Sequence, residues 1–140
     1  MNTDLPVPPA TQADTRPMTV LVVDDSVASA QALAMALEMD GYVAHVAFTG
    51  QSALAEASTH RPDCVLLDFG LDDMDGLQLA RTLRERHGDD VVMIMITGWD
   101  TTQERVGEAA ALVDHHFTKP LDLNRLRRIL PPIGPPRAAG

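Results

Sequence analysis

Short apolar runs alternate along the chain with segments in which apolar residues recur at steps of three and four. A short apolar run predicts a buried strand, and the three-and-four step predicts an amphipathic helix. Strands are predicted at 19–23, 42–48, 63–67, 91–96 and 113–117. Helical stripes follow them at 30–37, 50–57, 76–83, 106–110 and 123–130. Because parallel strands need crossover connections, this alternation predicts an α/β fold with a doubly wound five-stranded parallel sheet and helices on both faces.

The two ends of the chain differ from the middle. Residues 1–17 carry four prolines among polar residues, and residues 132–140 are again rich in proline. We expect both segments to be tails, the N-terminal one disordered, because neither has enough apolar residues to bury. Residues 18–131 are expected to form one domain around a single core of modest size.

Composition then narrows the classes of function. The formal net charge of -9 disfavours a nucleic-acid surface, which would need clustered basic residues. No apolar run is long enough to cross a bilayer and no signal peptide is apparent, so a cytoplasmic protein without membrane contact is expected. The single cysteine, Cys64, lies in an apolar run and is predicted to be a buried, inert thiol.

Polar residues with recognisable chemistry follow the predicted strands. Asp24 and Asp25 follow the first, Asp68 the third, Thr97 the fourth, and Lys119, the only lysine, the fifth. In a parallel sheet the carboxyl ends of the strands share one edge, so these side chains are expected to meet. Three carboxylates suit a divalent ion such as Mg²⁺, while a hydroxyl and a cation could hold oxygens of a phosphoryl group.

This set of residues resembles the response-regulator receiver family. The acidic pair Asp24-Asp25, the acceptor position Asp68, the hydroxyl of Thr97 and the pair Lys119-Pro120 stand in the family's order, and the resemblance covers roughly residues 18 to 131. It implies a flavodoxin-like fold with strand order 2-1-3-4-5 and a cis bond before the proline.

The resemblance also implies a mechanism. Asp68 would accept a phosphoryl group from a sensor histidine kinase or a histidine phosphotransfer protein, with Lys119 offsetting its charge. Mg²⁺, or Mn²⁺, would be held by Asp24, Asp25, Asp68 and the backbone carbonyl of Gly70. Such a module is not an enzyme in the ordinary sense, although it assists its own phosphorylation and dephosphorylation.

Four positions are expected to shape the response. The hydroxyl of Thr97 would be drawn to the added charge, and His116 stands where the family has the aromatic residue that couples to this step. Gly70 leaves space beside the acceptor, whereas Trp99 puts a bulky ring at the same mouth, so both are predicted to control the access of water to the site.

Two further segments are given ordinary structural roles. Asp72, Asp73 and Asp75 form an acidic run that lacks the glycine spacing of a Ca²⁺ loop, and they are predicted to lie in a solvated loop. Arg84, on the polar side of the third helical stripe, is predicted to face water.

The predicted function is that of a single-domain response regulator. Only about twenty residues follow Pro120, so output is expected through contacts with an unidentified downstream protein or through onward phosphotransfer. The alternative is a docking or scaffold module that keeps the receiver fold and signals without phosphate. An enzyme for small phosphorylated substrates would need a substrate pocket that no motif suggests.

Overall fold

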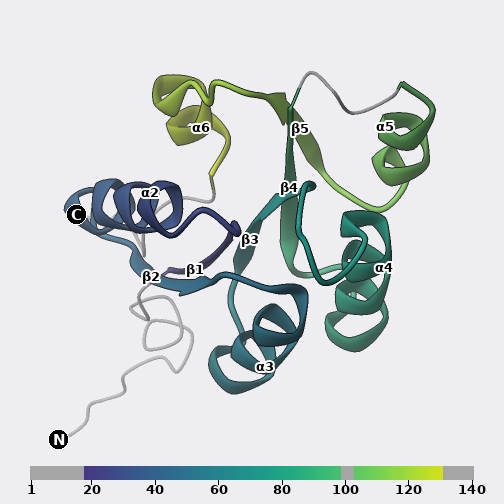
Figure 1. Ribbon diagram of the computed structural model, residues 1–140. Helices are drawn as coiled ribbons and strands as arrows, with labels where there is room; N and C mark the ends of the chain where they lie inside the picture. Colours follow the sequence, from purple (N-terminus) through teal and green to yellow (C-terminus); the bar gives the residue numbers. More distant parts are fainter. Residues whose placement is uncertain (1–17, 99–102, 131–140) are drawn as a thin grey trace, which may run out of the picture.

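A central parallel sheet organises the structure (Figure 1). The computed structural model describes residues 18–98 and 103–130, and the predicted tails and Trp99 lie outside these ranges. Within them the strands are β1 (Thr19–Val23), β2 (Val43–Ala47), β3 (Cys64–Asp68), β4 (Val92–Thr97) and β5 (His115–Thr118). Their order in the sheet is β2-β1-β3-β4-β5 and all neighbours pair in parallel. The predicted fold class and strand order are therefore confirmed.

The helices cover both faces of the sheet (Figure 1). They are α2 (Val27–Met39), α3 (Gly50–His60), α4 (Gly76–His87), α5 (Gln103–Ala110) and α6 (Leu123–Ile129). Leu37 of α2 and Leu126 of α6 pack with Leu66 on one face, whereas Leu54 of α3 and Leu83 of α4 pack on the other. Apolar runs such as that of β3, buried along its whole length, are explained by this double cover.

Polar caps fix where the helices begin. Ser26, Thr49, Asp75 and Asp122 stand at the N-caps of α2, α3, α4 and α6, and each side chain accepts a hydrogen bond from an amide of the first turn. Such bonds satisfy amides that have no partner within the helix. The caps of α2 and α3 lie within three residues of a strand end, so each chain reversal at the sheet edge is short.

The acidic run after β3 lies in an exposed loop, as predicted, and one of its members also contacts a helix N-terminus. Asp73 accepts hydrogen bonds from the backbone amides of Gly50 (2.8 Å) and Gln51 (3.1 Å), at the start of α3. These two bonds lower the pKa of Asp73. Because Asp75 caps α4, the loop that follows the predicted acceptor Asp68 is fastened to the N-termini of two helices.

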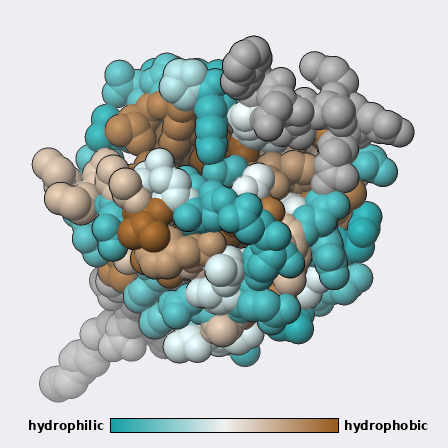
Figure 2. All heavy atoms as spheres, viewed as in Figure 1, coloured by the Kyte–Doolittle hydropathy of each residue, from teal (hydrophilic) through white to brown (hydrophobic). Residues whose placement is uncertain are grey.

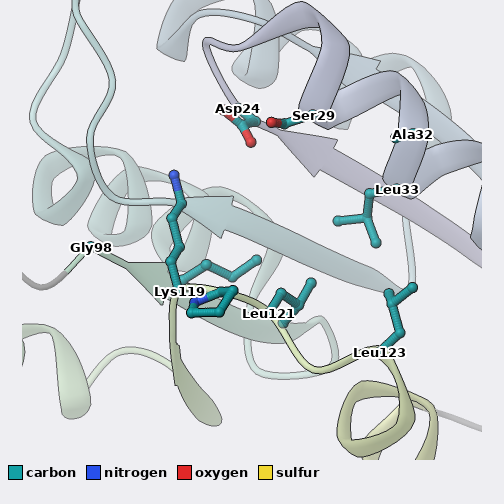
Figure 3. Close-up of a pocket in the computed structure, with 10 residues that line it drawn as sticks. Asp24, Ser29, Ala32, Leu33, Gly98, Lys119, Leu121 and Leu123 are labelled. Carbon is teal, nitrogen blue, oxygen red and sulfur yellow. The ribbon is translucent and has the colours of Figure 1, made fainter.

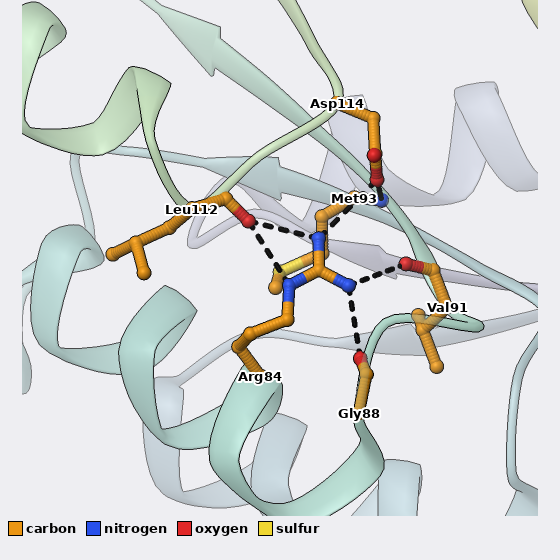
Figure 4. A network of polar contacts seen from close by, with 6 residues as sticks. All are labelled: Arg84, Gly88, Val91, Met93, Leu112 and Asp114. Carbon is orange, nitrogen blue, oxygen red and sulfur yellow. Dashed lines mark hydrogen bonds and ion pairs between the residues drawn. The ribbon is translucent and has the colours of Figure 1, made fainter.

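Arg84 does not face water, which corrects the prediction made for it. Its guanidinium donates to the carbonyls of Leu112, Gly88 and Val91 and to the carboxylate of Asp114 (Figure 4). The side chain is only 16% exposed. One arginine on α4 therefore joins the segments that lead into β4 and β5.

The outer surface is mixed in character. Figure 2 shows hydrophilic side chains spread between smaller apolar groups on the face in view. Among the described residues, the exposed large hydrophobic ones are Val27, Met35, Met39 and Val43. None of the described helices is both long and apolar enough to cross a bilayer.

Candidate functional site

The predicted site residues meet at the carboxyl edge of the sheet. Asp68 and Thr97 are the last residues of β3 and β4, and the amide of Lys119 bonds to the carbonyl of Thr97 at 2.8 Å. The amide of Asp24 bonds to the carbonyl of Ala47 at 3.0 Å, which extends the pairing of β1 with β2. Backbone pairing thus fixes the positions from which these side chains project.

Asp68 is the most deeply buried carboxylate of this group, with only 4% of the residue exposed. Its Oδ2 accepts from Nζ of Lys119 at 2.7 Å, and its Oδ1 accepts from the amide of Gly70 at 3.0 Å. A carboxylate offers about four acceptor sites, so these two bonds leave lone pairs free. Asp68 is therefore held in one orientation while keeping the capacity to attack an electrophile.

Three carboxylates gather around this point. Ligand oxygens of Asp24, Asp25 and Asp68 all lie within 4.8 Å of one another. Burial raises the pKa of Asp24, and the negative charge of Asp68 raises it further, against the lowering effect of the Ser26 amide and of Lys119. Carboxylates that repel one another at this spacing form the hard oxygen set that Mg²⁺ prefers. The chemistry of the donor set fits the divalent ion predicted from the sequence.

Lys119 supplies the positive charge of the site. Its hydrogen bond to Asp68 raises the pKa of the ammonium group, and the charges of Asp68, Asp24 and Asp25 act in the same direction, against some desolvation. The Lys119–Pro120 peptide is cis, as the resemblance implied. The side chain remains 46% exposed, so an incoming group can reach the ammonium from solvent.

Thr97 and His116 are in direct contact. Thr97 is 1% exposed, and its Oγ1 lies 2.8 Å from Nε2 of His116 on the neighbouring strand β5. The parallel register sets Thr97 beside Thr118 and Met95 beside His116, so the side chains of Thr97 and His116 approach along the diagonal. The contact between the two residues predicted to form a switch is present, while the switch itself stays a prediction.

Gly70 leaves the Asp68 carboxylate open on one side. A β-carbon added at Gly70 would stand 3.7 Å from Oδ1 of Asp68, so any side chain there would start beside the Asp68 carboxylate. The role of the Gly70 carbonyl as a metal ligand stays a prediction. Trp99, the other residue predicted to control access, lies outside the described residues.

A groove of about 980 Å³ leads away from the site between α2 and the segment before α6. Asp24 and Lys119 line its polar end, and Leu33, Leu121 and Leu123 line its apolar length (Figure 3). The sequence did not predict this groove, because its walls come from segments about 90 residues apart that only the fold brings together. In the sequence, the two leucines Leu121 and Leu123 after Pro120 are the signal that could have pointed to this groove.

Comparison with known proteins gives a consistent match. A model of the family described as response regulator receiver domain matches residues 20–131. The chain is 37% identical over 123 residues to the probable transcriptional regulatory protein TcrX of Mycobacterium tuberculosis, covering 85% of this chain and 52% of TcrX. It is 36% identical over 128 residues to the response regulator MprA of Mycolicibacterium vanbaalenii, covering 89% of this chain and 55% of MprA. This chain therefore spans about half the length of these curated relatives.

Solved structures agree in fold. The chemotaxis protein CheY4 of Vibrio cholerae superposes with a TM-score of 0.72 at 27% identity, covering 82% of this chain and 100% of that one. A receiver domain from Methylobacillus flagellatus gives a TM-score of 0.72 at 31% identity, covering 81% and 96% of the two chains.

Proposed function

Because this chain belongs to the response regulator receiver family, we propose that it accepts a phosphoryl group onto Asp68 from a phosphohistidine of a sensor kinase or phosphotransfer protein. The observation that carries the proposal is the arrangement of Asp68, a buried carboxylate ion-paired at 2.7 Å with Lys119 and grouped with Asp24 and Asp25. The protein then acts as a phosphorylated signalling partner and not as an enzyme with a released product.

The transfer needs only one bond to form and one to break. A carboxylate oxygen of Asp68 donates an electron pair to phosphorus, while the bond from phosphorus to the imidazole nitrogen breaks and its electron pair returns to the ring. The product is an acyl phosphate on Asp68. The Gly70 amide and the Lys119 ammonium hold the carboxylate oriented, which favours attack in line with the leaving nitrogen.

Charge on the phosphoryl group has to be offset during this step. Lys119 contributes a compact positive charge that can turn from the Asp68 carboxylate towards phosphoryl oxygens. Asp24, Asp25 and Asp68 would hold Mg²⁺ or Mn²⁺, which when bound supplies further positive charge to the phosphoryl oxygens. The same three carboxylates would otherwise repel an anionic donor.

The read-out would begin at Thr97. In the unphosphorylated state its hydroxyl is hydrogen-bonded to His116 at 2.8 Å. An acyl phosphate on Asp68 carries about -1.5 to -2 of charge, in place of the single negative charge of the carboxylate, and competes for that hydroxyl proton. If Thr97 turns to donate to the phosphoryl group, the bond to His116 is broken or reversed in direction, and His116 is released or reoriented on the surface of β5.

Partners of this protein are proposed from the same features. The groove beside Asp24 and Lys119 gives a donor protein an apolar surface next to the acceptor, and downstream proteins would read the face around His116. TcrX is named as a transcriptional regulatory protein, but this chain matches only about half of it, so no DNA contact is carried over. Membership of the receiver family fits a cytoplasmic protein.

The test is phosphorylation of the whole chain by acetyl phosphate with Mg²⁺, followed by intact mass. The expected result is one added phosphoryl group that Asp68→Asn loses and that removal of Mg²⁺ prevents. Asp72→Asn is the matched control, because it makes the same chemical change at an exposed position of the following loop. Thr97→Ala should still be phosphorylated but should lose the spectroscopic change that phosphorylation causes at His116.

One outcome would favour the phosphate-independent alternative. If neither acetyl phosphate nor any phosphohistidine donor adds mass to the folded chain, the protein is a docking or scaffold module with a receiver fold.

A further inference from the structure

Three side chains with metal-binding chemistry meet away from the phosphoacceptor site. They are His45 of β2 and Glu56 and His60 of α3, and one ligand atom from each lies within 4.8 Å of the others. Nε2 of His60 lies 3.1 Å from Oε1 of Glu56. The rings of His45 and His60 stack with their centroids 3.6 Å apart and their planes 12° from parallel. We call this group the histidine cluster.

The cluster rests on regular backbone. Glu56 and His60 are four residues apart on α3 and therefore project from the same face of the helix. His45 pairs with Leu21 in the sheet, and Leu21 belongs to the core cluster that packs against α3. The three side chains thus start from a helix and a strand whose relative position is fixed by the core. Ligands on such elements are held more precisely than ligands on loops.

We propose that the histidine cluster binds a divalent transition-metal ion of the Zn²⁺ class. Two imidazole nitrogens and one carboxylate oxygen form the set of three protein ligands that Zn²⁺ accepts while leaving a fourth position to water. Mg²⁺ prefers oxygen ligands, so the cluster selects a different ion from the one that suits Asp24, Asp25 and Asp68.

Binding requires a small local rearrangement. Ligand atoms on a tetrahedral Zn²⁺, with bonds of about 2.0–2.1 Å, lie about 3.3–3.5 Å apart, so atoms spread over as much as 4.8 Å draw together. The lone pair of an imidazole nitrogen lies in the ring plane, so two nearly parallel stacked rings cannot both point at one ion. At least one ring turns about its Cβ–Cγ bond. His60 and Glu56, with side chains 34% and 37% exposed, are free enough to do so.

A metal bound here would tie α3 to the edge strand β2. Because the ligands come together only in the folded chain, binding would favour the folded state. The site does not depend on the proposed phosphorylation of Asp68, and its ligands are not shared with the acidic group.

The test is a Zn²⁺ titration of the whole chain, followed by calorimetry and by the imidazole resonances in NMR. The acidic group can also take Zn²⁺, so the titration is repeated in Asp68→Asn, which should keep the cluster intact. In that background, His45→Gln and His60→Gln should each weaken Zn²⁺ binding at least about 10-fold. This is the smallest loss expected when a residue that only supports a metal ligand is replaced, and here the ligands themselves are replaced. His115→Gln is the matched control and should leave binding unchanged.

Two results would overturn the proposal. In the first, the Asp68→Asn chain binds Zn²⁺ equally well whether or not His45 and His60 are both changed to glutamine. In the second, added Zn²⁺ does not shift the ring resonances of His45 and His60 in the wild-type chain. This second test does not depend on any variant folding correctly. In either case the stacked rings and the Glu56 contact are packing interactions alone. A thermal midpoint that Zn²⁺ raises in the Asp68→Asn chain and not in the same chain lacking both histidines would support the site.

Discussion

Replacing Arg84 by alanine removes a cation that holds three segments of the fold together. Its five hydrogen bonds reach three backbone carbonyls and one carboxylate, with lengths from 2.8 to 3.2 Å. Asp114, the carboxylate partner, also accepts from the amide of Met93 at 2.8 Å. The alanine variant therefore leaves the turn before β4 and the turn before β5 without their common donor.

The loss of stability depends on how many of the broken hydrogen bonds water can replace. A hydrogen bond from a charged donor contributes about 1.5–3 kcal/mol to stability, and the bonds from Arg84 to backbone carbonyls are of this kind. The contact with Asp114 adds about 0–1 kcal/mol, because that carboxylate side chain is 45% exposed. Since these turns lie near the surface, water recovers part of what is lost. We expect Arg84→Ala to lower the free energy of unfolding by about 2–4 kcal/mol.

Urea denaturation measures this loss directly. With a slope of about 2 kcal/mol per molar urea, the middle of the range usual for small proteins, the midpoint should fall by about 1–2 M. Arg81→Ala, on the exposed face of the same helix, should change stability by less than about 0.5 kcal/mol. Arg84→Lys should recover less than half of the loss, because an ammonium group cannot reproduce the fork of the guanidinium. A loss below about 1 kcal/mol in the alanine variant would refute this account of the network.

Three further predictions concern packing, charge and reactivity. Gly76→Ala should destabilise the fold by about 1–3 kcal/mol, because the added β-carbon would stand 2.6 Å from a ring carbon of Phe69. Gly107→Ala, where the added β-carbon meets open space, should stabilise the fold by about 0.5–1 kcal/mol. Thermal melts of the two variants measure both effects. Asp73→Asn should lower the urea midpoint at neutral pH, and Asp72→Asn should not. Because hydrogen bonds from α3 lower the pKa of Asp73, its stabilising charge is present above the ordinary value of 3.8 and is lost as pH falls through the lowered pKa, so the difference between Asp73→Asn and the parent chain should shrink in acid. Cys64 should react with thiol reagents only as fast as the protein opens, since burial raises its pKa to about 12; labelling at the rate of a free thiol would contradict its burial.

Most of the fold could be predicted from the sequence because its signals are local. A run such as that of β3 is apolar at nearly every position because helices cover both of its faces, and the alternation of runs and stripes follows from the crossover connections. The strand order needed the family resemblance, since periodicity does not say which strands are neighbours. The starts of the helices coincide with caps such as Ser26, whose hydrogen bonds reach only a few residues along the chain.

The meeting of the polar side chains at one edge of the sheet could also be predicted, for a reason of geometry. Asp68, Thr97 and Lys119 each stand at or just after a strand end, and parallel strands bring all such ends to one edge. The identity of the residues then indicated the chemistry. The sequence did not indicate that Thr97 would already be hydrogen-bonded to His116, because that contact depends on the register between β4 and β5.

The sequence by itself thus determined the elements of this protein and the edge of the sheet on which Asp68, Thr97 and Lys119 gather, because both depend on residue type and on spacing within single segments. Tertiary structure alone decided which groups Asp73, Arg84 and the histidine cluster contact. The partners of Asp73 and Arg84 include backbone groups 22 to 28 residues away, and backbone groups leave no mark in the sequence. His45 meets His60 only because α3 packs across β2, so a pair of ordinary surface residues becomes a candidate metal site through the fold.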